Sequence, residues 1–349
     1  MPELPEVETV RSGLERTLRG RRFTHVDQRR RDLRFPLPDH FARRLTGRRV
    51  ESLGRRAKYI LIHLDGGEVL AVHLGMTGRF SVTLPRAHER QRNGPPPPMP
   101  EACFRHGGEG SGVGGNAIAD VLRSPPPYPS PTEGDGTKPE KRGETQLGEY
   151  VYRHGGDAKH DHLVFTMSDG TVVTYNDARR FGYMALIPEG ELETHEYFAG
   201  LGVEPLSEAL GPAYLAQRAR GKKADLKALL MDQRIIAGLG NIYACEALFR
   251  ARLDPFRPAA RLTTGTAKPT PAATRLVAAI KSVLADALRA GGSTLRDYKQ
   301  ADGSLGRFQN EFAVYGRAGE PCPRPGCRGR VRRKTQGGRS TFYCPACQR

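Results

Sequence analysis

The sequence predicts an α+β protein of several domains: an N-terminal β-sandwich with flanking helices, a helical region and a short C-terminal ribbon. Many short strand-like runs, separated by turn signals, lie between residues 23 and 187. Such runs favour a sandwich over a parallel sheet. From Pro212 onward, apolar residues recur at spacings of three and four, as on one face of a helix. Four cysteines then gather between positions 322 and 347.

The first predicted element is a helix over residues 5–19, and Gly20 follows it as a stop signal. Its apolar side chains recur at helical spacing and would pack inward: Val7, Val10, Leu14 and Leu18. This helix would hold the amino terminus at its entrance.

Two sets of strands follow. The first set is predicted at 23–26, 50–53, 59–64, 69–74 and 80–84, and the second at 162–167, 171–175 and 183–187. Asp65-Gly66-Gly67 and Ser168-Asp169-Gly170 are turn signals between neighbouring strands.

Residues 85–158 separate the two sets and differ from them in composition. They hold 12 Pro and 13 Gly in 74 residues, above the roughly 25–30% that marks low complexity without a repeat. We expect this insert to be mostly disordered.

Four helices are predicted after the sandwich, at 213–220, 224–231, 242–250 and 272–290. The link 232–241 joins the second to the third, and its Gly238 and Gly240 allow a close backbone approach. Asn241 stands where the next helix offers free N–H groups. The link is therefore either a phosphate site or an ordinary helical hairpin with Asn241 as its cap.

The four clustered cysteines have the spacing of a zinc site. Cys322 and Cys327 form one pair, and Cys344 and Cys347 follow sixteen residues later as the second. Four thiolates complete a tetrahedral Zn²⁺ and leave no position for water or substrate, so the single metal should be structural. The segment between the pairs turns at residues 336–338 and predicts a two-stranded ribbon. Its basic side chains suit phosphates: Arg328, Arg330, Arg332, Arg333, Lys334 and Arg339.

The charge of the chain points to nucleic acid. Of its 349 residues, 55 are Lys or Arg and 38 are Asp or Glu, which gives a net charge of +17 and a pI of about 9.9. No stretch reaches the ~20 apolar residues of a membrane span, and the first 30 residues lack a signal-peptide core. We expect a cytoplasmic, nucleoid-associated protein.

The amino terminus carries a candidate nucleophile. After removal of Met1 the chain would begin with the secondary amine of Pro2, and an α-amino group has a pKa of roughly 7.7–8.0. Such an amine can condense with a sugar carbon to give a Schiff base, and Glu3 could carry the protons. The alternative is that Pro2 and Pro5 merely begin a helix.

Seven separated motifs together resemble the formamidopyrimidine-DNA glycosylase family. They are PELPEVETV at 2–10, RRAKYI at 55–60, HLGMTGR at 73–79, NDARRFG at 176–182, LMDQRIIAGLGNIYACEALF at 230–249, VYGRAGEPC at 314–322 and STFYCPACQ at 340–348. The resemblance covers the chain except for roughly residues 85–158. It implies a bifunctional base-excision-repair enzyme that removes oxidised purines such as 8-oxoguanine and formamidopyrimidines, then cleaves the strand by β,δ-elimination.

The resemblance also implies roles for individual residues. Pro2 would attack the deoxyribose C1′, Glu3 would donate and accept protons, and Glu6 would help to hold the site. Lys58 would place a positive charge near the damaged nucleotide, and beside Pro2 this charge would favour the neutral amine. Arg339 of the ribbon is assigned both to the catalytic group and to DNA binding.

The remaining implied residues contact DNA. Met76, Arg179 and Phe181 would form a wedge that fills the hole left by the flipped nucleotide, although from the residues alone Met76 and Phe181 would be core side chains. The other implied contacts are His73, Lys223, Asn241 and Arg339, and residues 299–312 would lie where the family has a mobile loop.

The implied architecture is a catalytic sandwich at 1–205, a helix-two-turn-helix domain at 206–305 and a zinc ribbon at 306–349. The partner would be damaged double-stranded DNA and the protein a monomer without a membrane. Two alternatives stay open: an endonuclease VIII-type enzyme for oxidised pyrimidines, and a non-enzymatic zinc-ribbon DNA binder. The C-x4-C pair, where many relatives have C-x2-C, and the insert both depart from the family pattern.

We predict that the insert is dispensable, since the entropy of loop closure grows only logarithmically with length. A chain that lacks residues 88–156 should fold, bind lesion DNA and excise the damaged base at a rate within a few fold of the full chain. A deletion variant that folds and binds DNA but no longer excises would contradict this.

Overall fold

The computed structural model describes residues 2–85, 157–293 and 307–349. The predicted insert lies almost wholly outside these residues, and so do positions 299–306 of the predicted loop. Within the described ranges, no helix is long and apolar enough to cross a membrane.

The predicted first helix is α1, Leu4–Leu18, with Glu3 as its N-cap. Glu3 and Glu6 form a capping box, in which each side chain bonds to the backbone N–H of the other residue, and Pro5 occupies the first turn. Its predicted apolar face is buried in the core of the sandwich. The polar face keeps α1 at the edge of that core.

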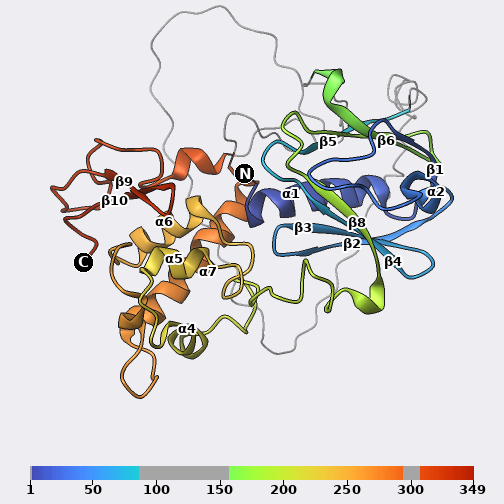
Figure 1. The fold of residues 1–349 in the computed structure, drawn as a ribbon. Helices are drawn as coiled ribbons and strands as arrows, with labels where there is room; N and C mark the ends of the chain where they lie inside the picture. The colour runs from blue at the N-terminus through green and yellow to red at the C-terminus, as the bar shows by residue number, and fades with distance from the viewer. Residues whose placement is uncertain (1, 86–156, 294–306) are drawn as a thin grey trace, which may run out of the picture. The chain divides into compact units, whose positions relative to one another are not determined.

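The eight predicted strands form a sandwich of two four-stranded antiparallel sheets (Figure 1). One sheet has the order β1-β6-β7-β5 and the other the order β2-β3-β4-β8. The strands are β1 (Phe23–Gln28), β2 (Val50–Arg56), β3 (Tyr59–Leu64), β4 (Glu68–His73), β5 (Arg79–Thr83), β6 (Asp161–Met167), β7 (Val172–Asn176) and β8 (Tyr183–Pro188).

The insert interrupts the first sheet between β5 and β6, which both pair with β7. Thr83 lies opposite Val172 at one end of β7, and Asp161 lies opposite Asn176 at the other. The β-sandwich prediction is confirmed, and the strands on either side of the insert meet in one sheet.

A short helix, α2 (Phe41–Leu45), was not predicted. It is only five residues long and therefore shows too little periodicity to be identified from sequence. Its two ends, Phe41 and Leu45, are buried in the sandwich core. Burial of these two side chains accounts for the helix.

The second half is helical, as expected, and has its own core. Its helices are α4 (Pro212–Ala219), α5 (Leu226–Met231), α6 (Asn241–Arg250) and α7 (Pro271–Arg289). Short 3-10 segments lie at Ala158–His160, Glu189–Glu191, Ala259–Leu262 and Phe308–Glu311. Helix α6 is buried on nearly every side, which places it between the other elements.

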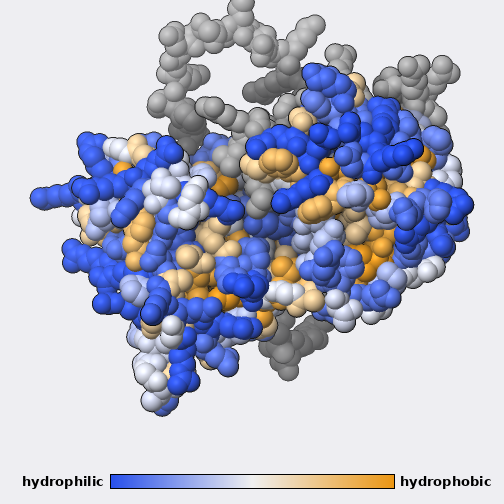
Figure 2. All heavy atoms as spheres, in the orientation of Figure 1, coloured by the Kyte–Doolittle hydropathy of each residue, from blue (hydrophilic) through white to orange (hydrophobic). Residues whose placement is uncertain are grey.

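The ribbon consists of β9 (Arg332–Gln336) and β10 (Arg339–Tyr343), which pair in antiparallel register. Its apolar side packs on α6, where Cys245 and Phe249 meet Phe342. The side chains of β9 are largely exposed, and the face over the ribbon is strongly hydrophilic (Figure 2). The ribbon therefore leaves its basic side chains exposed while its base is fixed to α6.

Candidate active site and nucleic-acid interface

The amino end of α1 meets the amino end of α6. The buried carboxylate of Glu3 accepts hydrogen bonds from the backbone N–H groups of Ile242 at 3.1 Å and Tyr243 at 3.5 Å. Leu4 N–H donates to the carbonyl of Gly238 at 3.2 Å. The free donors at the start of α6, which from the residues alone suggested a phosphate site, are thus taken by a carboxylate of the protein itself.

Only glycine fits at the N-cap of α6. A Cβ atom on Gly240 would lie 2.2 Å from the carboxyl carbon of Glu3. The backbone of the link 232–241 therefore packs closely against another group, as its glycines predicted. That group is the side chain of Glu3.

A second buried carboxylate, Glu6, holds the peptide at the amino terminus. Its Oε2 accepts from Glu3 N–H at 2.9 Å, and its Oε1 accepts from the Tyr243 hydroxyl at 2.5 Å. Ser293 donates to the same Oε1 through its backbone N–H at 2.8 Å and its hydroxyl at 2.9 Å. These bonds from α6 and from the segment that follows α7 fix the orientation of Pro2 and Glu3.

Lys58 lies in the tight turn between β2 and β3 and is buried. The preceding residue, Ala57, has a φ of 53°, a conformation that costs a non-glycine residue energy. Glu204 stabilises this turn, since its carboxylate accepts from Ala57 N–H at 2.6 Å and from Arg55 and Arg56 at 2.8 and 2.9 Å. Glu204 therefore positions Lys58.

Burial sets the protonation of this cluster. It lowers the pKa of Lys58, and the charge of Glu3 opposes this shift while that of Arg339 adds to it. It raises the pKa of Glu3, and Lys58 opposes the shift. Both groups are thus pushed toward their neutral forms, which suits a proton carrier beside a buried Pro2.

The predicted wedge residues project from two loops and are not core residues. Met76 lies between β4 and β5 with 37% of its surface exposed, and Phe181 lies between β7 and β8 with 39% exposed. The guanidinium of Arg179 lies 4.7 Å from the centre of the Phe181 ring. Both side chains are exposed, so the interpretation that they belong to the core is wrong.

His73 is placed differently from the other predicted DNA contacts. Its ring stacks on Tyr183, with ring centres 4.8 Å apart, and its Nδ1 accepts from Gly75 N–H at 3.1 Å. Burial, with Lys58 and Arg34 nearby, lowers its pKa to about 4. At neutral pH His73 therefore offers a hydrogen bond rather than a positive charge.

The other predicted DNA contacts lie in the helical half and in the ribbon, with Lys223 between α4 and α5, Asn241 at the start of α6 and Arg339 at the start of β10. Lys223 and Arg339 are exposed. The Asn241 amide nitrogen donates to the Ser340 carbonyl at 3.0 Å and to the Tyr315 hydroxyl at 3.4 Å. Asn241 thus joins α6 to β10, next to Arg339, and its amide must turn before it can donate to a phosphate.

Two buried charged residues of the helical half were not predicted from the sequence. The Nζ of Lys227 donates to the Thr341 hydroxyl at 2.7 Å, and burial lowers its pKa. Lys227 and Arg339 also line a cavity of about 540 Å³ between α5 and the ribbon. Glu246 accepts from the backbone N–H groups of residues 313–315 at 2.8–3.0 Å. Both lie on apolar helix faces, where only an unexpected charge in a buried position signals them.

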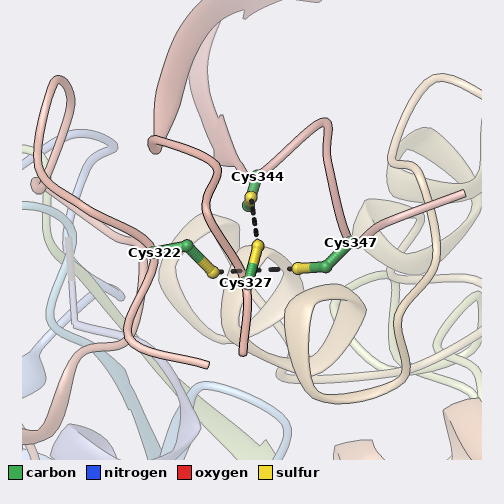
Figure 3. Close-up of side chains that lie close together, drawn as sticks. All are labelled: Cys322, Cys327, Cys344 and Cys347. Carbon is green, nitrogen blue, oxygen red and sulfur yellow. Dashed lines mark hydrogen bonds between the residues drawn. The ribbon is translucent and has the colours of Figure 1, made fainter. Parts of the chain in front are cut away.

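The four predicted zinc ligands converge. Their Sγ atoms all lie within 4.8 Å of one another and point toward one centre (Figure 3). The Sγ atoms of Cys322 and Cys347 are 3.8 Å apart, and so are those of Cys327 and Cys344. Thiolates about 2.3 Å from a tetrahedral Zn²⁺ are separated by about 3.8 Å. The site fits one structural zinc ion.

The family models and the relatives that match this chain indicate the same family. Residues 1–107 match the formamidopyrimidine-DNA glycosylase N-terminal domain, 201–299 the H2TH domain of the same glycosylase, and 319–349 a zinc finger found in FPG and IleRS. The chain is 48% identical to a formamidopyrimidine-DNA glycosylase of Chelativorans sp. (strain BNC1), with 100% of both chains covered.

Solved structures are similar over the same length. The MutM (Fpg) protein of Thermus thermophilus is 34% identical and has a TM-score of 0.68, with 99% of this chain and 98% of that chain covered. Lactococcus lactis Fpg in complex with DNA that contains an oxidised pyrimidine is 26% identical and has a TM-score of 0.69, with 100% of both chains covered.

We predict that Gly240→Ala lowers base excision by roughly 100-fold or more, because the new Cβ displaces Glu3 and acid–base catalysis is worth about 10²–10⁴. Single-turnover excision would measure the rate. Gly211→Ala is a matched control, since Gly211 is the N-cap of α4 and no atom lies within 4 Å of the position that its Cβ would take. Equal rates for the two variants would contradict the prediction.

We predict that Cys344→Ser lowers the zinc content well below one ion per chain and weakens duplex binding more than tenfold, because the metal holds the ribbon in its fold. Metal analysis and a binding titration would measure both. Cys245→Ser, in a buried cysteine outside the cluster, should keep one zinc. Zinc loss without any loss of affinity would contradict the role given to the ribbon.

Proposed function

Since this chain belongs to the formamidopyrimidine-DNA glycosylase family, and is a DNA glycosylase and AP lyase of base excision repair, we propose that the amine of Pro2 is its nucleophile. The observation that carries this proposal is the arrangement around the amino terminus. Glu3 is held by the first N–H groups of α6, with Lys58 buried in the same cluster. A proton carrier thus lies one residue from the amine.

In the proposed reaction the Pro2 nitrogen attacks C1′ of the damaged nucleotide, and the bond from C1′ to the base breaks. The departing base takes a proton, and the sugar ring opens to a Schiff base. Loss of a C2′ proton then expels the 3′ phosphate, and a second elimination expels the 5′ phosphate. Each step needs a group that gives or takes a proton.

We assign that task to Glu3. Its raised pKa favours the protonated form that donates to the leaving base or to the ring oxygen, and the same carboxylate then accepts the C2′ proton. In its charged form Lys58 would disfavour a proton on the Pro2 amine and would place positive charge near the reacting nucleotide. Glu6 keeps the peptide in place and takes no part in proton transfer.

The wedge and the phosphate contacts would stabilise duplex DNA from which the damaged nucleotide is flipped out. Met76, Arg179 and Phe181 would fill the gap left in the duplex, where unstacking costs a few kcal/mol. Lys223, Asn241 and Arg339 would neutralise or bind flanking phosphates, so the affinity for DNA should fall steeply with salt. His73 would contribute one neutral hydrogen bond.

We propose oxidised purines as the substrates, because the chain begins PELPEV and carries the Met, Arg and Phe wedge. The alternative is an oxidised-pyrimidine enzyme, and the oxidised-pyrimidine complex of the Lactococcus lactis protein keeps it worth testing. Membership in an enzyme family excludes the non-enzymatic binder. The boundaries near 205 and 305, the monomeric state and the action at the nucleoid stay predictions.

Borohydride trapping tests the nucleophile. We expect a covalent adduct between the chain and a duplex with 8-oxoguanine, because borohydride reduces a Schiff base to a stable amine. We expect no adduct with Pro2→Gly, which lacks the secondary amine of proline. A chain with an uncleaved amino-terminal tag should bind the duplex but form no adduct, since its Pro2 nitrogen is an amide. A trapped adduct in the tagged chain would overturn the assignment of Pro2.

Paired substrates test the lesion class. The single-turnover excision rate on an 8-oxoguanine duplex should exceed that on a thymine-glycol duplex of the same sequence by at least tenfold. The reverse order would support the oxidised-pyrimidine alternative.

A further inference from the structure

We propose that the hydroxyl of Thr77 and the buried carboxylate of Asp177 lock together the two loops that carry the wedge, so that Met76, Arg179 and Phe181 enter the duplex as one rigid unit. Thr77 and Asp177 are then positioning residues. The inference rests on the proposed function, in which these three side chains fill the gap left by the flipped nucleotide.

The two loops are distant in sequence and adjacent in the fold. One connects β4 to β5 and the other connects β7 to β8, so each passes from one sheet of the sandwich to the other. Neither loop belongs to a strand ladder at its tip. Strand pairing fixes the ends of both loops, since His73 lies opposite Tyr183 and Arg79 lies opposite Asn176. Contacts between the loops must then fix the tips that carry Met76 and Phe181.

Thr77 makes that contact. Its hydroxyl donates to Asp177 Oδ1 at 2.5 Å and accepts from the backbone N–H of Arg179 at 3.1 Å. One side-chain oxygen thus ties the residue after Met76 to the backbone of a second wedge residue.

Asp177 is fully buried and is bound from several directions. Its Oδ2 accepts from Gly182 N–H at 2.8 Å and from the Tyr175 hydroxyl at 3.4 Å. Its carbonyl oxygen hydrogen-bonds to the ring of His162 at 2.8 Å. A buried carboxylate is tolerated only when such donors satisfy it, so Asp177 fixes both ends of the 177–182 loop.

The backbones of the loops also touch. Gly75 has a φ of 62°, and a Cβ atom at this position would lie 2.2 Å from the carbonyl carbon of Phe181. There is no space for one loop to slide past the other. The exposed side chains of Met76 and Phe181 thus project from one fixed base.

A wedge that is held on a rigid base loses less conformational entropy when it enters the duplex. Ordering a mobile side chain at an interface costs conformational entropy, and a wedge that is already ordered avoids this cost. Arg179 lies over the Phe181 ring, so the second loop is ordered within itself as well. The bond from Thr77 extends this order to Met76.

Thr77→Val tests the lock, because valine keeps the shape and removes the hydroxyl. We expect single-turnover excision of 8-oxoguanine from duplex DNA to fall about tenfold, with full recovery in Thr77→Ser. Strand cleavage at an abasic site in single-stranded DNA needs no wedge and should stay within twofold of the unchanged chain. That second reaction, measured on the same sample, also reports that the variant is folded.

A matched decrease on single-stranded and duplex substrates would show a merely structural role for Thr77 and overturn the inference. An unchanged rate of Thr77→Val on the duplex would overturn it too. The fluorescence of 2-aminopurine placed beside the lesion gives a direct readout of insertion, and its rise should be slower in Thr77→Val.

A double-mutant cycle separates the lock from the wedge. In a Met76→Ala background, Thr77→Val should have little further effect on duplex excision, because its partner in the wedge is already gone. Full additivity would overturn the lock. If Met76→Ala and Phe181→Ala each leave duplex excision unchanged, the wedge assignment fails and the lock fails with it. If they slow excision and Thr77→Val does not, only the lock fails.

Discussion

The carboxylate of Glu3 at the first turn of α6 is the interaction on which the rest of the site depends. It joins the amino terminus of the chain, on the sandwich side, to the most buried helix of the second half. The start of a helix carries partial positive charge and free N–H groups, so it orients an acidic side chain without a further partner. The same helix bears the ribbon through Cys245 and Phe249. One element thus aligns the reacting end of the chain with the zinc-held DNA contacts.

The site brings several ionisable side chains together in a buried position, which is electrostatically unfavourable. Glu3, Glu6 and Lys58 are all buried, and burial disfavours every charged form among them. Hydrogen bonds from α6 and Ser293 offset part of that cost for the two carboxylates. The remaining imbalance raises the pKa of Glu3 and lowers the pKa of Lys58.

The sequence predicted most of the fold because its periodicities are strong and its turns are marked by glycine. All eight predicted strands and α1 form within a few residues of their expected ends. Helix α2 was missed because five residues carry no period. Lys227 and Glu246 were missed because their partners lie far away in sequence. A pattern along the chain cannot register such long-range partners.

The sequence predicted the chemical type of the site, but it did not predict every contact that the site residues make. The glycine-bearing link did mark a close approach, yet residues alone could not say whether its partner was a phosphate or Glu3. The exposure of Met76 and Phe181 also contradicted the simplest interpretation of their apolar side chains. Tertiary structure decides such cases, because burial depends on which loop lies beside which.

The pairing of β5 and β6 with β7 sets how much chain the interrupted sheet needs. Both strands run antiparallel to β7 and hence parallel to each other, from the level of Asn176 to that of Val172, so the connection must return from the level of Val172 to that of Asn176. At about 3.3 Å per residue and about 4.8 Å between strands, the return path spans roughly 16 Å, which about five extended residues can cover. The 74 residues found there exceed this reach many times over. The sheet therefore imposes no upper bound on this connection, and the length of the chain at this point can change between relatives while the geometry around Glu3 stays the same.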